Sequence, residues 1–200
     1  MKTLFSLVTS TALLISAPAF AETLLENSSL INGNVLQGQG RIGVNMAAGD
    51  QNAQINAAAL AVSYGQGAHA TLDLQQNVRL TEAEWAHDST STITENAFSN
   101  ATGVISVNQV SGLGNAQVNA VAIGLGIEGE AITEIGLASA TTGYNAELAP
   151  TDTGHREARI DDKAFDGSSG LIQVNQLAGS GNATANSFQL NISLGLDNEQ

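Results

Sequence analysis

Three segments of this chain repeat one spaced pattern, and they superpose without a gap. The segments span residues 40–62, 103–125 and 170–192, with starts 63 and 67 residues apart. Eight positions are identical in all three, and in the first segment these are Gly40, Ile42, Val44, Asn45, Gly49, Asn52, Ala53 and Asn56. Such repetition is typical of stacked architectures, in which a unit buries its apolar face only against a neighbouring unit.

Hydrophobic alternation predicts two strands in each segment. Ile42 and Val44 would point to one side of a first strand, and a turn rich in glycine and asparagine follows. A second alternating strand comes next. We expect its apolar side to face inward, as the first strand's does. The predicted inner apolar face comprises Ile42, Val44, Ile105, Val107, Ile172, Val174, Leu60, Ile123 and Leu190. The opposite side of the second strand, for example Ala122, is expected to be the outer one.

The predicted fold class is therefore all-β, a repeat-built β-solenoid or stack of β-arcs with variable linkers. Ala70 to Leu80 and Ala131 to Ser139 also alternate and could add strands, whereas Gly143 to Asp166 is polar and predicts a flexible excursion. The expected divisions are a signal peptide (1–21), an N-terminal cap or lead-in segment (22–39), repeat 1 (40–62), linker 1 (63–102), repeat 2 (103–125), linker 2 (126–169), repeat 3 (170–192) and a C-terminal tail (193–200).

Asparagine recurs at three fixed offsets in the repeats. In strands stacked about 4.8 Å apart, a side-chain amide can donate to one neighbour and accept from the other. A lone buried amide would cost roughly 1–3 kcal/mol, and like residues in register remove that cost. We predict such ladders at the strand positions and favour backbone turn bonds at the 52/115/182 positions. The candidate assembly residues are Asn45, Asn108, Asn175, Asn52, Asn115, Asn182, Asn56, Asn119 and Asn186.

The first residues predict export. Lys2 precedes a short apolar run over residues 4–15, and Ala19-Phe20-Ala21 is a small-x-small cleavage site. We expect cleavage after Ala21. The apolar run is too short to span a membrane, and no later stretch reaches about 18 apolar residues. The sequence therefore predicts a secreted chain without a membrane span after cleavage.

Charge and composition narrow the classes of function. Without Lys2, five basic residues stand against nineteen acidic ones, a net charge of −14. Such a chain repels nucleic acid, so no nucleic-acid partner is expected. The absence of cysteine excludes disulfides and thiolate metal sites.

Patterns that could carry chemistry are weak. Gly124–Gly129 fits G-x-G-x-x-G, but Glu128 would repel a phosphate and the following residues favour a strand over a helix. His155 with Glu157 and Asp161, or Glu84 with His87 and Asp88, could bind a metal weakly, although solvated linker charge explains both groups better. We therefore predict no enzyme activity, no catalytic residue, no cofactor and no metal site.

The repeats resemble a known family. GVNMAAGDQNAQINAAALA, followed by two copies of VNQ-x-x-G-x-G-N-A-x-x-N, is similar to the imperfect repeats in secreted subunits of Fap-type functional amyloids. The resemblance covers the three 23-residue units, and the leader and linkers fit that layout. It implies a biofilm fibre protein exported through a dedicated outer-membrane pore. Subunits of that family typically end in Cys-x-x-Cys, which this chain lacks, so a major subunit, a nucleator and a minor component all stay open.

The leading hypothesis is a secreted structural protein that self-assembles into, or nucleates, cross-β fibres of a bacterial biofilm matrix. Stacked repeats leave open strand edges, which template further chains. Its expected partners are other copies of itself and related fibre subunits, and its expected location is the cell surface or extracellular matrix. The alternative is a folded surface adhesin that does not polymerise and binds a host or matrix ligand through its linkers.

Overall fold

The fold, obtained as a computed structural model, consists of strands joined by turns and arcs. The structure describes residues 25–33, 38–65, 67–79, 87–142 and 154–195. The predicted signal peptide and its cleavage site lie outside these residues. The strands are β1 (Leu25–Ile31), β2 (Gln39–Ala48), β3 (Ala53–Tyr64), β4 (Ala68–Arg79), β5 (His87–Ile93), β6 (Thr102–Ser111), β7 (Ala116–Ile127), β8 (Ala131–Thr142), β9 (Arg156–Ile160), β10 (Ser169–Ala178) and β11 (Ala183–Leu194).

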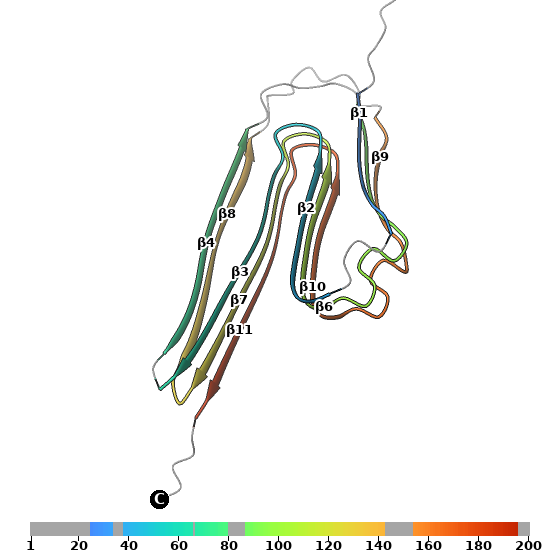
Figure 1. Cartoon of the computed structure of the whole chain (residues 1–200). Helices are drawn as coiled ribbons and strands as arrows, with labels where there is room; N and C mark the ends of the chain where they lie inside the picture. The colour runs from blue at the N-terminus through green and yellow to red at the C-terminus, as the bar shows by residue number, and fades with distance from the viewer. Residues whose placement is uncertain (1–24, 34–37, 66, 80–86, 143–153, 196–200) are drawn as a thin grey trace, which may run out of the picture.

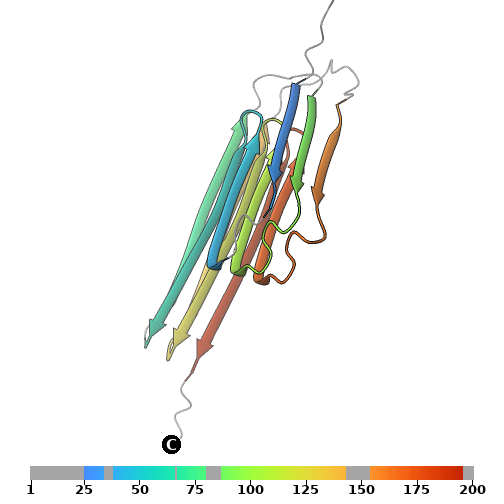
Figure 2. The same cartoon turned by 45° about the vertical axis from the view of Figure 1, so that its right-hand side comes forward.

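Each strand pairs in parallel with its counterpart one repeat away. Four sheets result, which we call sheet A (β1, β5, β9), sheet B (β2, β6, β10), sheet C (β3, β7, β11) and sheet D (β4, β8). The chain winds through the sheets in order, so β1–β4 form layer 1, β5–β8 form layer 2 and β9–β11 form layer 3 (Figure 1). Figure 2 shows equivalent strands of the layers running side by side.

The register is the one that the repeats require. Asn45 pairs with Asn108, which pairs with Asn175, and Asn56, Asn119 and Asn186 align in the same way. The expectation of an all-β, repeat-built stack is therefore confirmed.

The stacked unit is wider than the 23-residue repeat. Alternating segments in the linkers form β4 and β8, which stack as sheet D. The lead-in segment supplies β1, which pairs with β5 in sheet A. Part of the expected flexible excursion, Arg156–Ile160, is strand β9 paired with β5, which corrects that expectation for this part; residues 143–153 lie outside the described residues.

The main cluster of buried apolar side chains lies between sheets A and B and the arcs that join them. Its buried side chains include Ile93, Phe98, Ile105 and Val107. Phe98 stacks on Phe165 of the next layer, with ring centroids 5.1 Å apart. Each layer therefore covers the apolar side chains of the one before it, as repeat proteins require.

Small side chains bring sheets C and D together. Val118, Ala120 and Ala122 of β7 are at most 1% exposed. A Cβ placed on Gly124 would lie 3.3 Å from the Cβ of Ala131 in β8. Larger residues on these faces would force the two sheets apart.

Candidate assembly site

The first asparagine ladder runs through sheet B. The Nδ2 atom of Asn108 donates to the Oδ1 atom of Asn45 at 3.0 Å, and the Nδ2 atom of Asn175 donates to the Oδ1 atom of Asn108 at 3.0 Å. Asn108 is fully buried and Asn175 is 7% exposed. Identical amides in register therefore satisfy one another where water is excluded.

A second ladder in sheet C faces the first and is bonded to it. The Nδ2 atom of Asn119 donates to the Oδ1 atom of Asn56 at 3.0 Å, and Asn186 donates likewise to Asn119 at 3.0 Å. The Nδ2 atom of Asn119 also lies 2.9 Å from the Oδ1 atom of Asn108. The two ladders form one amide network between sheets B and C.

The third asparagine set lies at the turn between the same sheets. Asn52 donates from Nδ2 to the Gly49 carbonyl at 3.2 Å, a bond within the turn. Its Oδ1 atom accepts from the backbone N–H and the Nδ2 of Asn115, at 3.0 and 2.9 Å. Asn182 makes the same two bonds to Asn115. The prediction that these asparagines bond within their turns therefore describes only part of their role, because the side chains also link successive layers.

Buried glutamines extend the network, and the sequence interpretation did not include them. Gln54 donates to the Oε1 atom of Gln117 at 2.6 Å, and Gln176 donates to that of Gln109 at 3.0 Å. Gln109 and Gln117 are fully buried. The sequence did contain a sign of them: one position is glutamine in the first two repeats (Gln54, Gln117), and another is glutamine in the last two (Gln109, Gln176).

Two columns of glycine let the layers approach closely. Gly49, Gly112 and Gly179 have φ between 96° and 126°, a range that side chains disfavour. A Cβ on Gly112 would overlap the carbonyl oxygen of Gly179. The second column, Gly40, Gly103 and Gly170, behaves in the same way, since a Cβ on Gly103 would overlap the carbonyl oxygen of Gly40.

Only some of the side chains of the predicted inner apolar face are buried. Ile105 and Val107 are fully buried, and Ile42, Val44 and Val174 pack against the main apolar cluster. Leu60, however, is 73% exposed, Leu190 39% and Ile172 37%, and Ile123 is half-buried. The assignment for the second strand is corrected, because its alanine-rich side packs on sheet D while the Leu60 side is exposed beyond Asn56.

The revised faces predict different effects for two neighbouring substitutions. Ala122→Lys would place a charge in the fully buried space between sheets C and D, whereas Lys at position 123 can extend into water from a half-buried site. We expect Ala122→Lys to lower the free energy of unfolding by about 3 kcal/mol or more, and Ile123→Lys by much less. Denaturant unfolding of both variants measures this. An equal loss would contradict the revised faces.

The two ends of the stack are open. Every residue of the middle layer from Ile105 to Ala122 is buried, whereas β2 of layer 1 and β11 of layer 3 alternate between half-buried and exposed residues over most of their length. Asn182 and Asn186 are the last members of their ladders, and each donates back to the asparagine of the layer before it. Both ends therefore present strand edges with unused hydrogen-bonding capacity.

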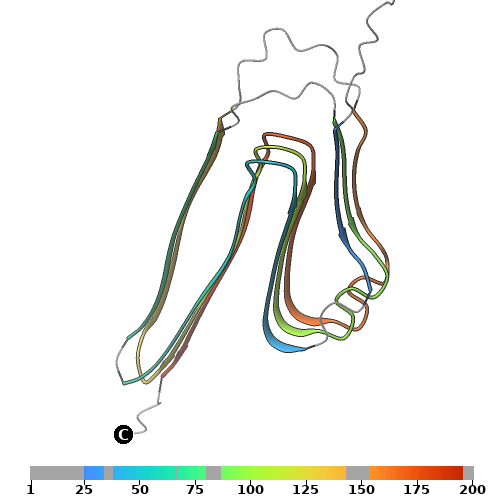
Figure 3. The ribbon, with the colours of Figure 1, turned by 45° about the horizontal axis from the view of Figure 1, so that its top comes forward.

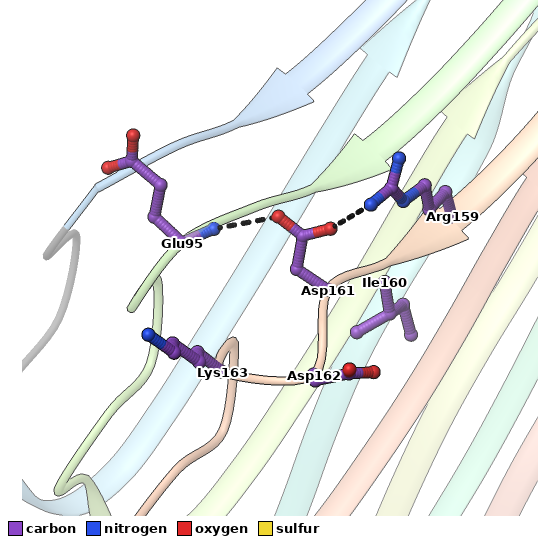
Figure 4. A pocket seen from close by; sticks show the side chains of 6 residues that line it. All are labelled: Glu95, Arg159, Ile160, Asp161, Asp162 and Lys163. Carbon is purple, nitrogen blue, oxygen red and sulfur yellow. Dashed lines mark hydrogen bonds and ion pairs between the residues drawn. The ribbon is translucent and has the colours of Figure 1, made fainter.

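A hollow of about 400 Å³ lies beside the arc that follows β9 (Figure 4). Its central carboxylate, that of Asp161, is already engaged by Arg159 at 2.7 Å and by the backbone N–H of Glu95 at 3.2 Å. The carboxylate of Asp161 therefore serves an ion pair and a backbone hydrogen bond that hold the arc.

The other chemical candidates gain no support from the geometry. Gly124–Gly129 leads from β7 into β8, so no helix follows the glycines as phosphate binding would require. His155 lies 3.5 Å from Glu157, and no three acids or histidines in the described residues are placed to hold a metal ion. No helix in the described part of the chain is long and apolar enough to cross a membrane.

One exposed contact joins layers 1 and 2 near the end of sheet C. The hydroxyl of Tyr64 donates to Glu128 at 2.5 Å, and this bond raises the pKa of Tyr64 above its ordinary value. The stabilisation from this bond is therefore present below the tyrosine's ordinary pKa and is lost as the pH rises through the raised one.

Comparison with known proteins found related sequences. A family profile described as "Functional amyloid protein FapB/FapC family" matches residues 11–193. The functional amyloid subunit FapC of Pseudomonas aeruginosa is 34% identical over 101 residues, which are 48% of this chain and 29% of that protein. The match thus spans less than a third of the relative's length. No solved structure matches the chain.

Proposed function

Because this chain belongs to the functional amyloid protein FapB/FapC family, we propose that it stacks head to tail into cross-β fibres of a bacterial biofilm matrix. The observation that carries the proposal is the in-register pairing of three layers that ends in open strand edges. A second copy can continue every column of sheets A, B and C by placing its layer 1 on layer 3 of the first.

The hydrogen bonds between successive asparagines of each ladder share one direction, which suits such stacking. In each ladder, the Nδ2 atom of the later layer donates to the Oδ1 atom of the earlier one, as in the step from Asn186 to Asn119. Layer 3 therefore presents the acceptors of Asn182 and Asn186, while layer 1 presents amide donors. The ends are complementary, and the fibre is expected to be polar.

Charge favours contact at the ends. The five basic residues beyond the leader all lie in the terminal layers or their arcs, whereas the described charged residues of the middle layer are acidic. The basic residues are Arg41, Arg79, Arg156, Arg159 and Lys163. Repulsion between copies of this acidic chain is thus weakest where layer 3 of one would meet layer 1 of the next.

Purified mature chain is expected to form fibres that bind thioflavin and diffract near 4.7 Å along the fibre axis. Electron microscopy and fibre diffraction after incubation at micromolar concentration measure this. A chain that stays monomeric at high concentration for days would contradict the proposal.

Substitution of Gly40 tests stacking between copies without disturbing contacts within one copy. Gly40 and Gly103 share a column, and a Cβ at Gly103 would overlap the Gly40 carbonyl, whereas a Cβ at Gly40 meets nothing within 4 Å. In a head-to-tail stack, a Cβ at Gly40 would meet the Gly170 carbonyl of the preceding copy. We therefore expect Gly40→Ala to fold but to lose seeded fibre elongation.

Gly65→Ala is the matched control. Gly65 also has a positive φ, 76°, and an open Cβ position, and the next residue of its column, Glu128, carries a side chain at φ 60°. The stack therefore tolerates a side chain there. Elongation is measured by thioflavin fluorescence on wild-type seeds. Unchanged elongation of Gly40→Ala, with that variant folded, would rule out the proposed junction.

We further propose export before assembly, with cleavage after Ala21 and passage through an outer-membrane pore to the cell surface. The leader of residues 1–21 supports export, and the family supports assembly outside the cell. The mass of the protein recovered from culture fibres is expected to correspond to a chain that begins at Glu22. A mass that includes the leader would contradict this.

A further inference from the structure

Nine apolar side chains form one face on the second half of sheet C, which we call the apolar stripe. Six of them, all in layers 1 and 3, are among the exposed large hydrophobic residues of the described chain, and Leu60 and Tyr64 are 73% and 70% exposed. Its three columns are Leu60, Ile123 and Leu190; Val62, Leu125 and Ile192; and Tyr64, Ile127 and Leu194.

The middle layer shows that stacking does not cover this stripe. Layer 2 has a neighbour on both sides, and all its residues from Ile105 to Ala122 are buried. Ile123, Leu125 and Ile127 nevertheless remain half-buried, in alternation with buried glycines. Head-to-tail stacking covers strand edges and leaves this sheet face in water. The stripe would therefore run along the whole fibre.

Sheet B does not cover the stripe either. Sheets B and C diverge from the turn that joins them (Figure 3). Near that turn, a Cβ on Gly43 would lie 3.5 Å from the Cβ of Asn56, so the sheets are in contact there. Further along, Ala58 and Leu60 are exposed. The stripe begins where the two sheets separate.

We propose that the apolar stripe is a lateral docking surface for the same stripe on a second stack of this chain, so that fibres pair side by side. This inference rests on the proposed head-to-tail function. One subunit's stripe spans three strands about 4.8 Å apart and about five residues of 3.3 Å rise, which gives about 200 Å². Two facing subunits thus bury about 400 Å², well below the roughly 1,200 Å² of a stable specific interface.

The small area buried per subunit determines whether monomers or only longer stacks can pair. Two monomers present too little apolar surface, whereas stacks of about three subunits or more reach the required area through contacts that act together. Pairing is therefore a property of the fibre and not of the free chain. It follows elongation and does not compete with it.

Electrostatics set the conditions for pairing. None of the nine side chains of the stripe is charged at neutral pH, but the chain as a whole carries a net charge of −13. Two stacks therefore repel each other at low ionic strength, and salt screens this repulsion, with a Debye length of about 10 Å at 0.1 M. The number of paired filaments is expected to rise with salt.

The test compares Val62→Lys with Ile132→Lys. Val62 lies in the stripe and is 61% exposed, and Ile132 lies on the outward face of sheet D and is 40% exposed. Both variants place one charge in every subunit. We expect both to elongate on seeds like wild type. Electron micrographs at raised salt are expected to show paired filaments for wild type and Ile132→Lys, and a loss of pairs for Val62→Lys.

The outcomes separate the two proposals. Absence of any fibre from wild type would contradict the proposed function, whereas Val62→Lys fibres that pair as often as wild type would overturn the stripe. Wild-type fibres that stay single at all salt concentrations yet bind an apolar dye would also overturn it, because another partner would then be needed. If Val62→Lys fails to elongate, Val62→Ser provides the same comparison without a charge.

Discussion

Replacement of Gly112 by alanine is expected to disrupt the contact between layers 2 and 3. Gly112 lies in the middle layer at φ 126°, a conformation that alanine disfavours. Its added Cβ would overlap the carbonyl oxygen of Gly179, which accepts from the Nδ2 atom of Asn115, while the Gly179 N–H donates to the Ser111 carbonyl. We expect a loss of about 3 kcal/mol or more in the free energy of unfolding.

The control separates the conformational cost from the clash. Gly40 has a similar φ, 114°, but a Cβ there would meet nothing within 4 Å. Gly40→Ala is expected to cost only about 1–3 kcal/mol, the strain of the backbone alone. Denaturant unfolding followed by circular dichroism, under conditions that keep the chain monomeric, measures both. Similar midpoints for the two variants would mean that the layers are not as close as the structure has them.

Asn119→Ala is the second substitution with a large expected effect. Asn119 is fully buried, and its Nδ2 atom lies near three acceptors: the Oδ1 atoms of Asn56 and Asn108 and the Val107 carbonyl. Its Oδ1 atom accepts from Asn186 and Asn175. Alanine would leave several of these groups unpaired in a space closed to water. Each orphaned group costs about 1–3 kcal/mol, so we expect a total of about 3 kcal/mol or more.

Asn77→Ala is the matched control, because Asn77 is on the exposed outward side of β4. We expect it to change stability by less than about 0.5 kcal/mol. The difference between the two variants reports the amide network and not asparagine content. If Asn119→Ala were as stable as Asn77→Ala, the ladders would contribute little, and the case for templating by amide register would be lost.

The asparagines and the apolar residues show which contacts could be predicted from the sequence and which could not. Asn45, Asn108 and Asn175 lie at one offset, and a parallel stack is the arrangement that brings such residues together. The glutamines were missed because each column has glutamine in only two repeats, with Met46 and Thr184 in the third. A strict search for identity across three copies excludes such positions, although two glutamines suffice for a bond between two layers.

The faces of the second strand could not be predicted, since alternation shows that its two sides differ but not what lies against each. Leu60 and Ile123 are more apolar than Ala59 and Ala122, and hydrophobicity alone therefore predicted that Leu60 and Ile123 face inward. Sheet D decides the matter, because its close approach admits only small side chains opposite. That sheet comes from the linkers, where Ala68 aligns with Ala131 and Leu74 with Leu137, while most other aligned residues differ.

Repeated residues by themselves determined the register of stacking, because residues at one offset in each copy form a column only when the copies lie in register. Glycine at the same two positions in each copy likewise required layers in close contact. Only the tertiary structure decided the order of the four sheets, the burial of the alanine side and the exposure of the apolar stripe. Those features depend on which sheet packs against which, and that is set by side-chain volume and by turn geometry in segments outside the three copies.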